Sequence, residues 1–193
     1  MVSKTREKFI EVARQLFARK GVENTTMNDI ASASSKGRRT IYTYFKSKTE
    51  IFNAVIETES DKILSRLRLI LSKPVSPEEK LRDYIATRFD AMKEIVGRNG
   101  SLRAGFFRDV RKVERAQRLI ASKELALLSE ILREGVESGA FNIPDIKKEA
   151  VIIIHSVQGL VVPFIRDSLS DYGISPDLIK AMMADTILNG ITS

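Results

Sequence analysis

Basic and hydroxyl-bearing side chains are concentrated in one short stretch near the start of the chain. They are Lys36, Arg38, Arg39, Thr40, Tyr42, Tyr44 and Lys48. An arginine guanidinium presents a planar pair of donors that matches O6 and N7 of guanine in the major groove of duplex DNA. Lysine and hydroxyl groups bind phosphate and sugar oxygens, which position a protein on the duplex. The stretch therefore predicts a DNA-binding surface.

The two arginines are the candidates for base contact. Arg38 and Arg39 stand at the start of a predicted short helix, and Lys36 adds positive charge in the turn before it. The residue types equally allow one of the arginines to bind a phosphate, so the sequence leaves both roles open.

The neighbouring hydroxyl groups are expected to hold the DNA backbone. Thr40, Tyr42 and Tyr44 would bind phosphate or sugar, and Lys48 would bind another phosphate together with the first amides of its helix. The alternative for Tyr42 is a core position with its hydroxyl hydrogen-bonded. Thr26 is expected to cap a helix, with phosphate contact as a second use.

Charge is segregated along the chain in the way that a polyanion-binding module predicts. Residues 1–48 hold 11 Lys and Arg against 4 Asp and Glu, whereas residues 49–193 hold 21 of each. The whole net charge of +7 thus belongs to the first quarter of the chain. A positively charged module on a neutral body is typical of nucleic-acid binding, and a solvated basic face is the alternative.

Helical patterns position these groups. Apolar residues recur at spacings of three and four over about 4–20, and Gly21 ends that helix. Thr26 and Asp29 have the spacing of a capping box for the next short helix. Residues 34–37 form the turn, and a helix over about 38–45 is expected to bury Ile41 and Phe45. This layout is a helix-turn-helix.

The rest of the chain is predicted to be helical as well. Ser47 and Glu50 repeat the capping spacing, and a long helix follows to about residue 72. A break at 73–77 places Pro77 at a first helical position. Further helices are expected over about 77–96, 102–107, 110–137, 145–168 and 176–189. We therefore expect an all-α protein of about nine helices, with a DNA-binding domain over 1–47 and a helical regulatory and dimerisation domain over 48–193.

The sequence resembles the tetracycline-repressor family of bacterial transcriptional regulators. The resemblance is carried by Ile10, Ala13, Leu16, Phe17, Gly21, Thr25, Thr26, Ile30, Ala31, the run Thr40-Ile41-Tyr42-Thr43-Tyr44-Phe45, Ser47 and Lys48. It covers about fifty N-terminal residues; beyond them only the helical layout and the pairs Gly159-Leu160 and Gly190-Ile191 are similar. The resemblance implies a homodimer that binds a palindromic DNA operator, usually as a repressor released by a small-molecule effector.

The turn departs from the pattern of that family. Members usually have a small residue, glycine, an apolar residue and serine where this chain has Ser34, Ser35, Lys36 and Gly37. Arg39 stands where glycine is common. These changes add positive charge at the entrance to the groove, so the operator preference of relatives does not transfer.

Composition limits the other classes of function. The chain has no cysteine, which removes disulfides, thiolate zinc sites and cysteine nucleophiles. Its N-terminus lacks an apolar signal core, and the apolar stretch 151–165 is shorter than the about 20 residues that span a membrane. We expect a cytoplasmic protein with no cofactor, no metal site and no membrane partner.

Two other readings remain as alternatives. A helical enzyme would need a phosphate-binding glycine loop, a nucleophile elbow or a catalytic triad, and the sequence contains no such motif. We therefore expect no enzymatic activity, although distant residues could converge in space. A non-specific nucleic-acid-binding dimer is the other alternative, but the basic module lacks the interleaved aromatic residues that stack on single-stranded RNA.

A dimer is expected because two helix-turn-helix units about 34–36 Å apart are needed to reach successive major grooves. The last two predicted helices are the candidate interface of this dimer. Both helices are apolar around much of their circumference, and glycines would permit close approach. The candidate interface residues are Gly159, Leu160, Met183, Ile187 and Gly190. A role for these helices in the core of a single chain is the alternative.

The body is also expected to bind the effector. The candidate ligand-binding residues are Phe89, Met92, Phe106, Phe107, His155 and Gln158, with Phe141, Phe164 and Met182 as further apolar candidates. Aromatic and methionine side chains at helical spacing are equally typical of an ordinary core. His155, the sole histidine, would bind the ligand, cross the dimer interface or fill a structural position.

Overall fold

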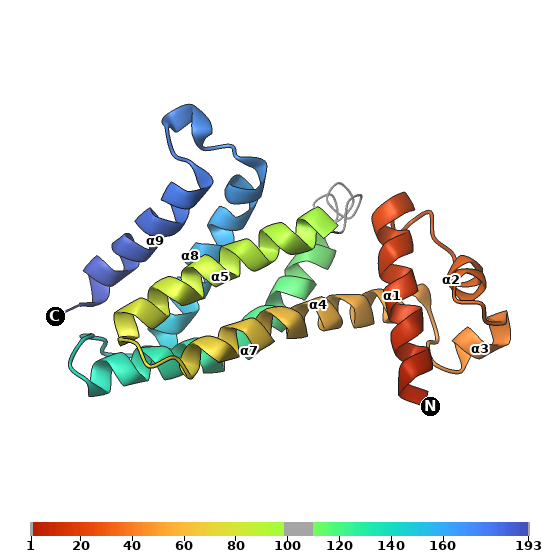
Figure 1. Cartoon of the computed structure of the whole chain (residues 1–193), viewed down its shortest axis with the longest axis horizontal. Coiled ribbons are helices and arrows are strands. Elements are labelled where there is room, and N and C mark those ends of the chain that lie inside the picture. Colours follow the sequence, from red (N-terminus) through yellow and green to blue (C-terminus); the bar gives the residue numbers. More distant parts are fainter. Residues whose placement is uncertain (1, 99–109, 193) are drawn as a thin grey trace. The chain divides into compact units, whose positions relative to one another are not determined.

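This computed structural model describes residues 2–98 and 110–192, which contain eight α-helices, one short 3-10 helix and no strand. The elements are α1 (Val2–Lys20), α2 (Met27–Ala33), α3 (Arg38–Tyr42), α4 (Lys48–Leu71), α5 (Pro77–Arg98), α7 (Val110–Glu137), α8 (Ile146–Arg166), η1 (Ser170–Tyr172) and α9 (Pro176–Ile191) (Figure 1). The predicted all-α fold is confirmed. The short helix expected over 102–107 lies outside the described residues.

Residue contacts divide the chain into two compact units. The first comprises Met1–Asp61 and Ile95–Leu119, and the second Lys62–Glu94 and Ile120–Ser193. The long helix α4 crosses the boundary between Asp61 and Lys62, so it contributes residues to both units.

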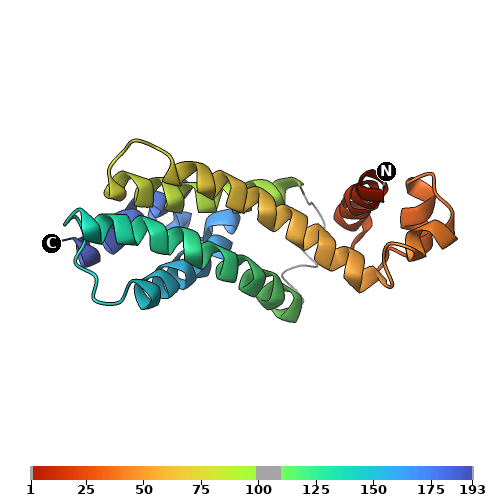
Figure 2. The same cartoon turned by 90° about the horizontal axis from the view of Figure 1, so that it is seen from below.

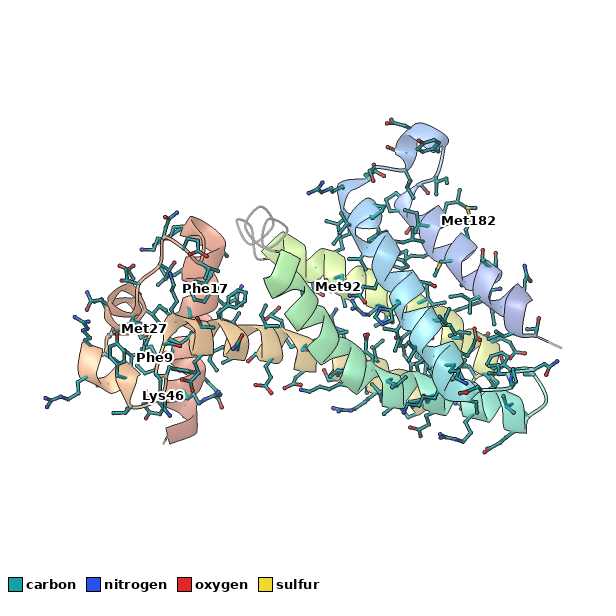
Figure 3. All side chains as sticks on the ribbon, turned by 180° about the vertical axis from the view of Figure 1, so that it is seen from behind. Phe9, Phe17, Met27, Lys46, Met92 and Met182 are labelled. Carbon is teal, nitrogen blue, oxygen red and sulfur yellow. The ribbon has the colours of Figure 1, made fainter. Side chains whose placement is uncertain are left out.

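The core of the first unit is built from the apolar stripes of α1 to α4. Phe9, Phe17, Ile30, Ile41 and Phe45 are all buried. Figure 3 shows Phe9, Phe17 and Met27 among these helices. Burial of the large side chains at helical spacing explains why such short helices hold together, since α2 and α3 are too short to be stable alone.

Local signals end and begin the helices as the sequence predicts. Gly21 adopts a φ of +86° after α1, a conformation that glycine tolerates best. Thr26 Oγ1 accepts a hydrogen bond from the Asp29 amide (3.1 Å), and Asp29 Oδ2 accepts one from the Thr26 amide (2.8 Å). The Thr26 amide and the Lys20 ammonium lower the pKa of Asp29 to about 2. The carboxylate of this capping box thus stays ionised at physiological pH.

The structure corrects one helix boundary near the predicted site. The second helix of the predicted helix-turn-helix was expected to reach residue 45, but α3 ends at Tyr42. Thr43 Oγ1 donates to the carbonyl of Thr40 (2.7 Å), and such side-chain bonds compete with helix propagation. Ile41 and Phe45 are nevertheless buried as expected.

The second unit is held by apolar packing and by ion pairs between helices. The connection 72–76 joins α4 to α5, and Figure 2 shows it in a second view. Lys80 on α5 donates to both carboxylate oxygens of Glu134 on α7 at 2.8 Å. Arg88 and Glu124 form a second α5–α7 pair that is almost fully buried. The sequence did not predict either pair.

Gly135 on α7 is required by close packing. A Cβ atom added at this position would lie 2.0 Å from Cδ2 of Phe141, whose amide donates to the Gly135 carbonyl at 3.0 Å. We therefore expect Gly135→Ala to lower the free energy of unfolding by about 1 to 3 kcal/mol, because overpacking outweighs the higher helix propensity of alanine. Chemical denaturation measures this. The control is Gly97→Ala on α5, where nothing lies within 4 Å of the added atom; an equal effect of both substitutions would contradict the packing explanation.

Candidate DNA-binding surface

The turn between α2 and α3 is fixed by backbone hydrogen bonds. Ser34 is fully buried, and the amide of Lys36 donates to the carbonyl of Ala31 at 3.0 Å. Ser35 adopts a left-handed φ of +55°, which costs a non-glycine residue about 1 kcal/mol. Gly37 occupies the N-cap of α3 without a side-chain hydrogen bond. The departures Ser35 and Gly37 thus leave the turn in place. They remove a glycine from the left-handed position and a serine from the N-cap, both of which would stabilise the turn.

Recognition helix α3 is anchored by one residue and exposes most of the others. Ile41 is fully buried, whereas Lys36, Arg38 and Arg39 are exposed and Tyr42 is 44 % exposed. The Arg38 guanidinium lies 5.9 Å from the centre of the Tyr42 ring, within the range of a cation–π contact. The structure thus leaves Lys36, Arg38, Arg39 and Tyr42 accessible on α3 and the preceding turn and places Arg38 beside Tyr42, which is not a core residue.

Three hydroxyl candidates lie at the margin of this face. Thr40 is half-buried, and Tyr44 is half-buried with its ring 5.8 Å from that of Phe9. Thr26 is exposed but its hydroxyl already caps α2. Any contact of these groups with DNA therefore adds to a structural role that the residue already has.

Lys48 is placed differently from the other basic candidates. Its ammonium donates to the carbonyls of Val22 (2.7 Å) and Glu23 (3.1 Å), which lie between α1 and α2. Two of its three protons are thereby used within the protein. The first residue of α4 is tied to the loop that leads into the helix-turn-helix. Sequence spacing contained no signal for this contact, because its partners are backbone atoms more than twenty positions away.

We expect Lys48→Met to lower the free energy of unfolding by about 1 to 2 kcal/mol, because it leaves the part-buried Val22 carbonyl without its charged donor. Chemical denaturation of the purified protein measures this loss. Lys46→Met, at an exposed position two residues earlier, is the control for removal of a positive charge. If both substitutions had the same effect, the hydrogen bonds of Lys48 to the Val22 and Glu23 carbonyls would not contribute to stability.

Arg6 on α1 is a basic residue that the sequence did not identify as a DNA-binding candidate. It is exposed, and its guanidinium lies 5.2 Å from the centre of the Phe45 ring, just after α3. The charge excess of residues 1–48 included Arg6, but only the structure places it next to the recognition helix.

The candidate dimer helices leave apolar side chains exposed. On α8, Ile152 is 61 % exposed, and on α9 Leu178 and Met182 are 41 % and 48 % exposed; Figure 3 labels Met182 on α9. The candidates Gly159 and Gly190 are exposed, and Leu160, Met183 and Ile187 are half-buried.

Helix α8 is long and apolar enough to cross a membrane by length and composition alone, which does not overturn the expectation from the stretch 151–165. Core helices of soluble proteins have the same length and composition, so one such helix does not indicate a membrane span.

The candidate ligand residues separate into interior and surface positions. Phe89 is buried with its ring centre 5.0 Å from that of Phe164, and Met92 is half-buried. Oε1 of Gln158 is buried and has no hydrogen-bond partner among the described residues. These side chains all belong to the second unit.

The other ligand candidates are exposed, packed elsewhere or outside the described residues. His155 is exposed on α8, and Met182 is exposed on α9. Phe141 is buried against Gly135. Phe106 and Phe107 lie outside the described residues.

Sequence comparison matches both parts of the chain to one family. "Bacterial regulatory proteins, tetR family" matches residues 9–55, and "Tetracyclin repressor-like, C-terminal domain" matches residues 77–180. The transcriptional repressor KstR2 of Mycolicibacterium smegmatis is 27 % identical over 84 % of this chain and 75 % of its own length. The probable acrEF/envCD operon repressor of Escherichia coli K12 is 37 % identical over 42 % of this chain and 38 % of its own length.

Solved structures have the same fold. A transcriptional regulator from Cytophaga hutchinsonii has a TM-score of 0.75 at 24 % identity, over 97 % of this chain and 98 % of its own. The fatty acid degradation regulator FadR from Bacillus halodurans has a TM-score of 0.71 at 19 % identity, over 96 % and 95 %. With its helix-turn-helix matched at one end and its helical body at the other, the chain belongs to the tetR family of bacterial regulatory proteins and is a DNA-binding transcriptional regulator.

Proposed function

We propose that the protein is a homodimeric repressor that binds a palindromic operator and is released by a small-molecule effector. The observation that carries the proposal is the outer face of α3, where Arg38 and Arg39 are exposed while Ile41 anchors the helix in the core. An exposed guanidinium on a short rigid helix suits readout of guanine in the major groove. The names of the relatives, two of which are repressors, support repression.

Dimerisation is supported by the exposed apolar residues of α8 and α9. One helix-turn-helix makes few contacts, and two copies about one helical turn apart would read the two half-sites of a palindrome. Apolar side chains exposed on a helix pair are typical of an interface between chains. Gly159 and Gly190, both exposed, would permit close approach of helices across the interface.

Release by an effector is supported by α4 and by the structural relatives. Helix α4 has residues in both units, and Lys48 ties its first turn to the loop before α2. A change in the second unit that moves α4 would therefore pull on the helix-turn-helix, with a coupling limited by the effector's preference between the two states. Two solved structures of similar fold hold small molecules: SmeT is a complex with triclosan, and a putative transcriptional regulator from Saccharomonospora viridis is a complex with choline.

The test is binding to duplex DNA from immediately upstream of the protein's own gene, against a scrambled duplex of equal length, at several salt concentrations. We expect tight, selective binding at two chains, or a multiple of two, per site. Weak binding that is equal on both duplexes and lost as salt rises would contradict the proposal, because it would mean contact with phosphates alone.

We expect Arg39→Ala to weaken operator binding by about 1 to 3 kcal/mol and to relax sequence preference if the side chain reads a base. Equal weakening on operator and scrambled DNA would assign Arg39 to a phosphate instead. Arg133→Ala, an exposed arginine on α7 in the second unit, is the control for loss of one charge. No change on either duplex would remove Arg39 from the interface.

A further inference from the structure

The second unit contains an ion pair whose burial is unusual for a helical core. The side chains of Arg88 on α5 and Glu124 on α7 are 6 % and 1 % exposed, and Arg88 Nε lies 2.6 Å from Glu124 Oε1. Tyr84, one turn before Arg88 on the same helix, is 1 % exposed. Burial raises the pKa of the Tyr84 hydroxyl, and the Glu124 carboxylate adds to this effect. Three polar groups therefore share one interior location.

The hydrogen-bonding capacity of the pair is not used up. Arg88 Nη1 and both carboxylate oxygens of Glu124 are buried and have no hydrogen-bond partner among the described residues, although Oε1 lies within ion-pair distance of Arg88 Nε. Buried polar atoms in proteins are nearly always hydrogen-bonded, and each exception needs an explanation. Stability does not supply one, since replacement of a buried ion pair by apolar residues is often neutral or stabilising.

A second α5–α7 pair shows what a fully satisfied link between these helices looks like. Lys80 is 6 % exposed, and its ammonium donates to both oxygens of Glu134, which reaches solvent. The two helices are thus already joined without Arg88 and Glu124. The unsatisfied donor and acceptor of the deeper pair remain available to a bound molecule.

We infer that Arg88 and Glu124 together recognise a neutral group that both donates and accepts hydrogen bonds, a hydroxyl or carboxamide on an apolar small molecule. The acceptor atom of such a group accepts a hydrogen bond from Arg88 Nη1, and its N–H or O–H donates one to Glu124 Oε2. Because the pair is neutral as a whole, it provides no net attraction that would offset the desolvation of a charged ligand, so neither an anion nor a cation is favoured. The apolar part of the ligand suits the apolar interior of this unit, in which Ile85 and Phe89 on α5 and Leu128 on α7, each within four positions of a member of the pair, are buried.

The identification of this molecule as the effector rests on the proposed function. The binding of the molecule to Arg88 and Glu124 is independent of that function. The test therefore measures binding without DNA, by ligand-observed NMR, for matched probes on one scaffold: benzyl alcohol, benzamide, benzoate, benzylammonium and toluene. We expect the alcohol and the amide to bind about tenfold more tightly than the other three, which corresponds to one net hydrogen bond. Release of operator DNA by the bound probes is then measured separately, so failure of the regulatory proposal is distinguished from failure of the site.

Two double variants test whether the probes bind at Arg88 and Glu124. In Arg88→Met/Glu124→Leu the preference for the neutral polar probes should disappear, and it should persist in the control Lys80→Met/Glu134→Leu. Circular dichroism and the melting temperature establish that both variants fold. Tighter binding of benzoate or benzylammonium, an unchanged preference in the Arg88/Glu124 variant, or no binding of any probe to the folded wild-type protein would each overturn the inference.

Discussion

Replacement of Arg88 by methionine should lower the free energy of unfolding by about 3 to 5 kcal/mol at neutral pH, because it leaves a buried carboxylate without its counter-charge. The side chain of Glu124 is 1 % exposed, so its carboxylate would be left in the interior without hydration to offset this cost. The double substitution Arg88→Met/Glu124→Leu should recover most of the loss. Chemical denaturation of both variants and the wild-type protein measures the coupling, and a double variant as unstable as the single one would contradict it.

The effect of Arg88→Met should depend on pH in a defined direction. Burial raises the pKa of Glu124 from its ordinary value of 4.5, and Arg88 opposes this increase. Without Arg88 the folded-state pKa rises further above the unfolded value, so the folded state holds its proton to higher pH. The variant should therefore be closest to wild-type stability near and below pH 4.5, and the deficit should grow as pH rises through the folded-state pKa. A deficit independent of pH would mean lost packing, not an uncompensated charge.

The double substitution Ile152→Glu/Met182→Glu should convert the proposed dimer to a monomer. Each apolar side chain contributes about 1.5 to 3 kcal/mol when buried, and a two-fold interface counts every substitution twice. A weakening of self-association by roughly 100-fold or more is expected, since about 2.7 kcal/mol corresponds to that factor. Analytical ultracentrifugation measures the mass, and operator binding should weaken in parallel because a single helix-turn-helix makes few contacts.

The control for this change is Leu69→Glu, which introduces one of the two negative charges at an apolar side chain 67 % exposed on α4. The Leu69 variant should associate like the wild-type protein. A wild-type protein that is already monomeric would contradict the proposed dimer, and a double variant that remains dimeric would place the interface elsewhere.

The helix-turn-helix could be predicted from the sequence because its signals are local. The Thr26–Asp29 capping box, Gly21 and the buried spacing of Ile41 and Phe45 each involve residues within a few positions of one another. Such patterns depend on helix geometry alone. The contact of Lys48 with the Val22 carbonyl could not be predicted in this way, since folding alone brings the two residues together.

The second unit was less predictable for a related reason. Periodicity identified its helices but not what covers each face, so exposed Met182 and buried Phe164 had the same appearance in sequence. The pair of Arg88 and Glu124 also left no trace, because a charge on a helix is expected to face solvent. Buried charge thus becomes visible only when the packing of α5 against α7 is known.

Only one of the five residues of α3, Ile41, is buried. Substitutions at Arg38, Arg39 and Tyr42 therefore alter the chemistry offered to DNA while leaving the core untouched, and exposed positions of this kind change stability by about 0.5 kcal/mol or less. Operator choice and fold stability are thereby nearly separable properties. A library randomised at these three positions should yield mostly folded proteins, from which variants with new operator preferences can be selected without compensating mutations.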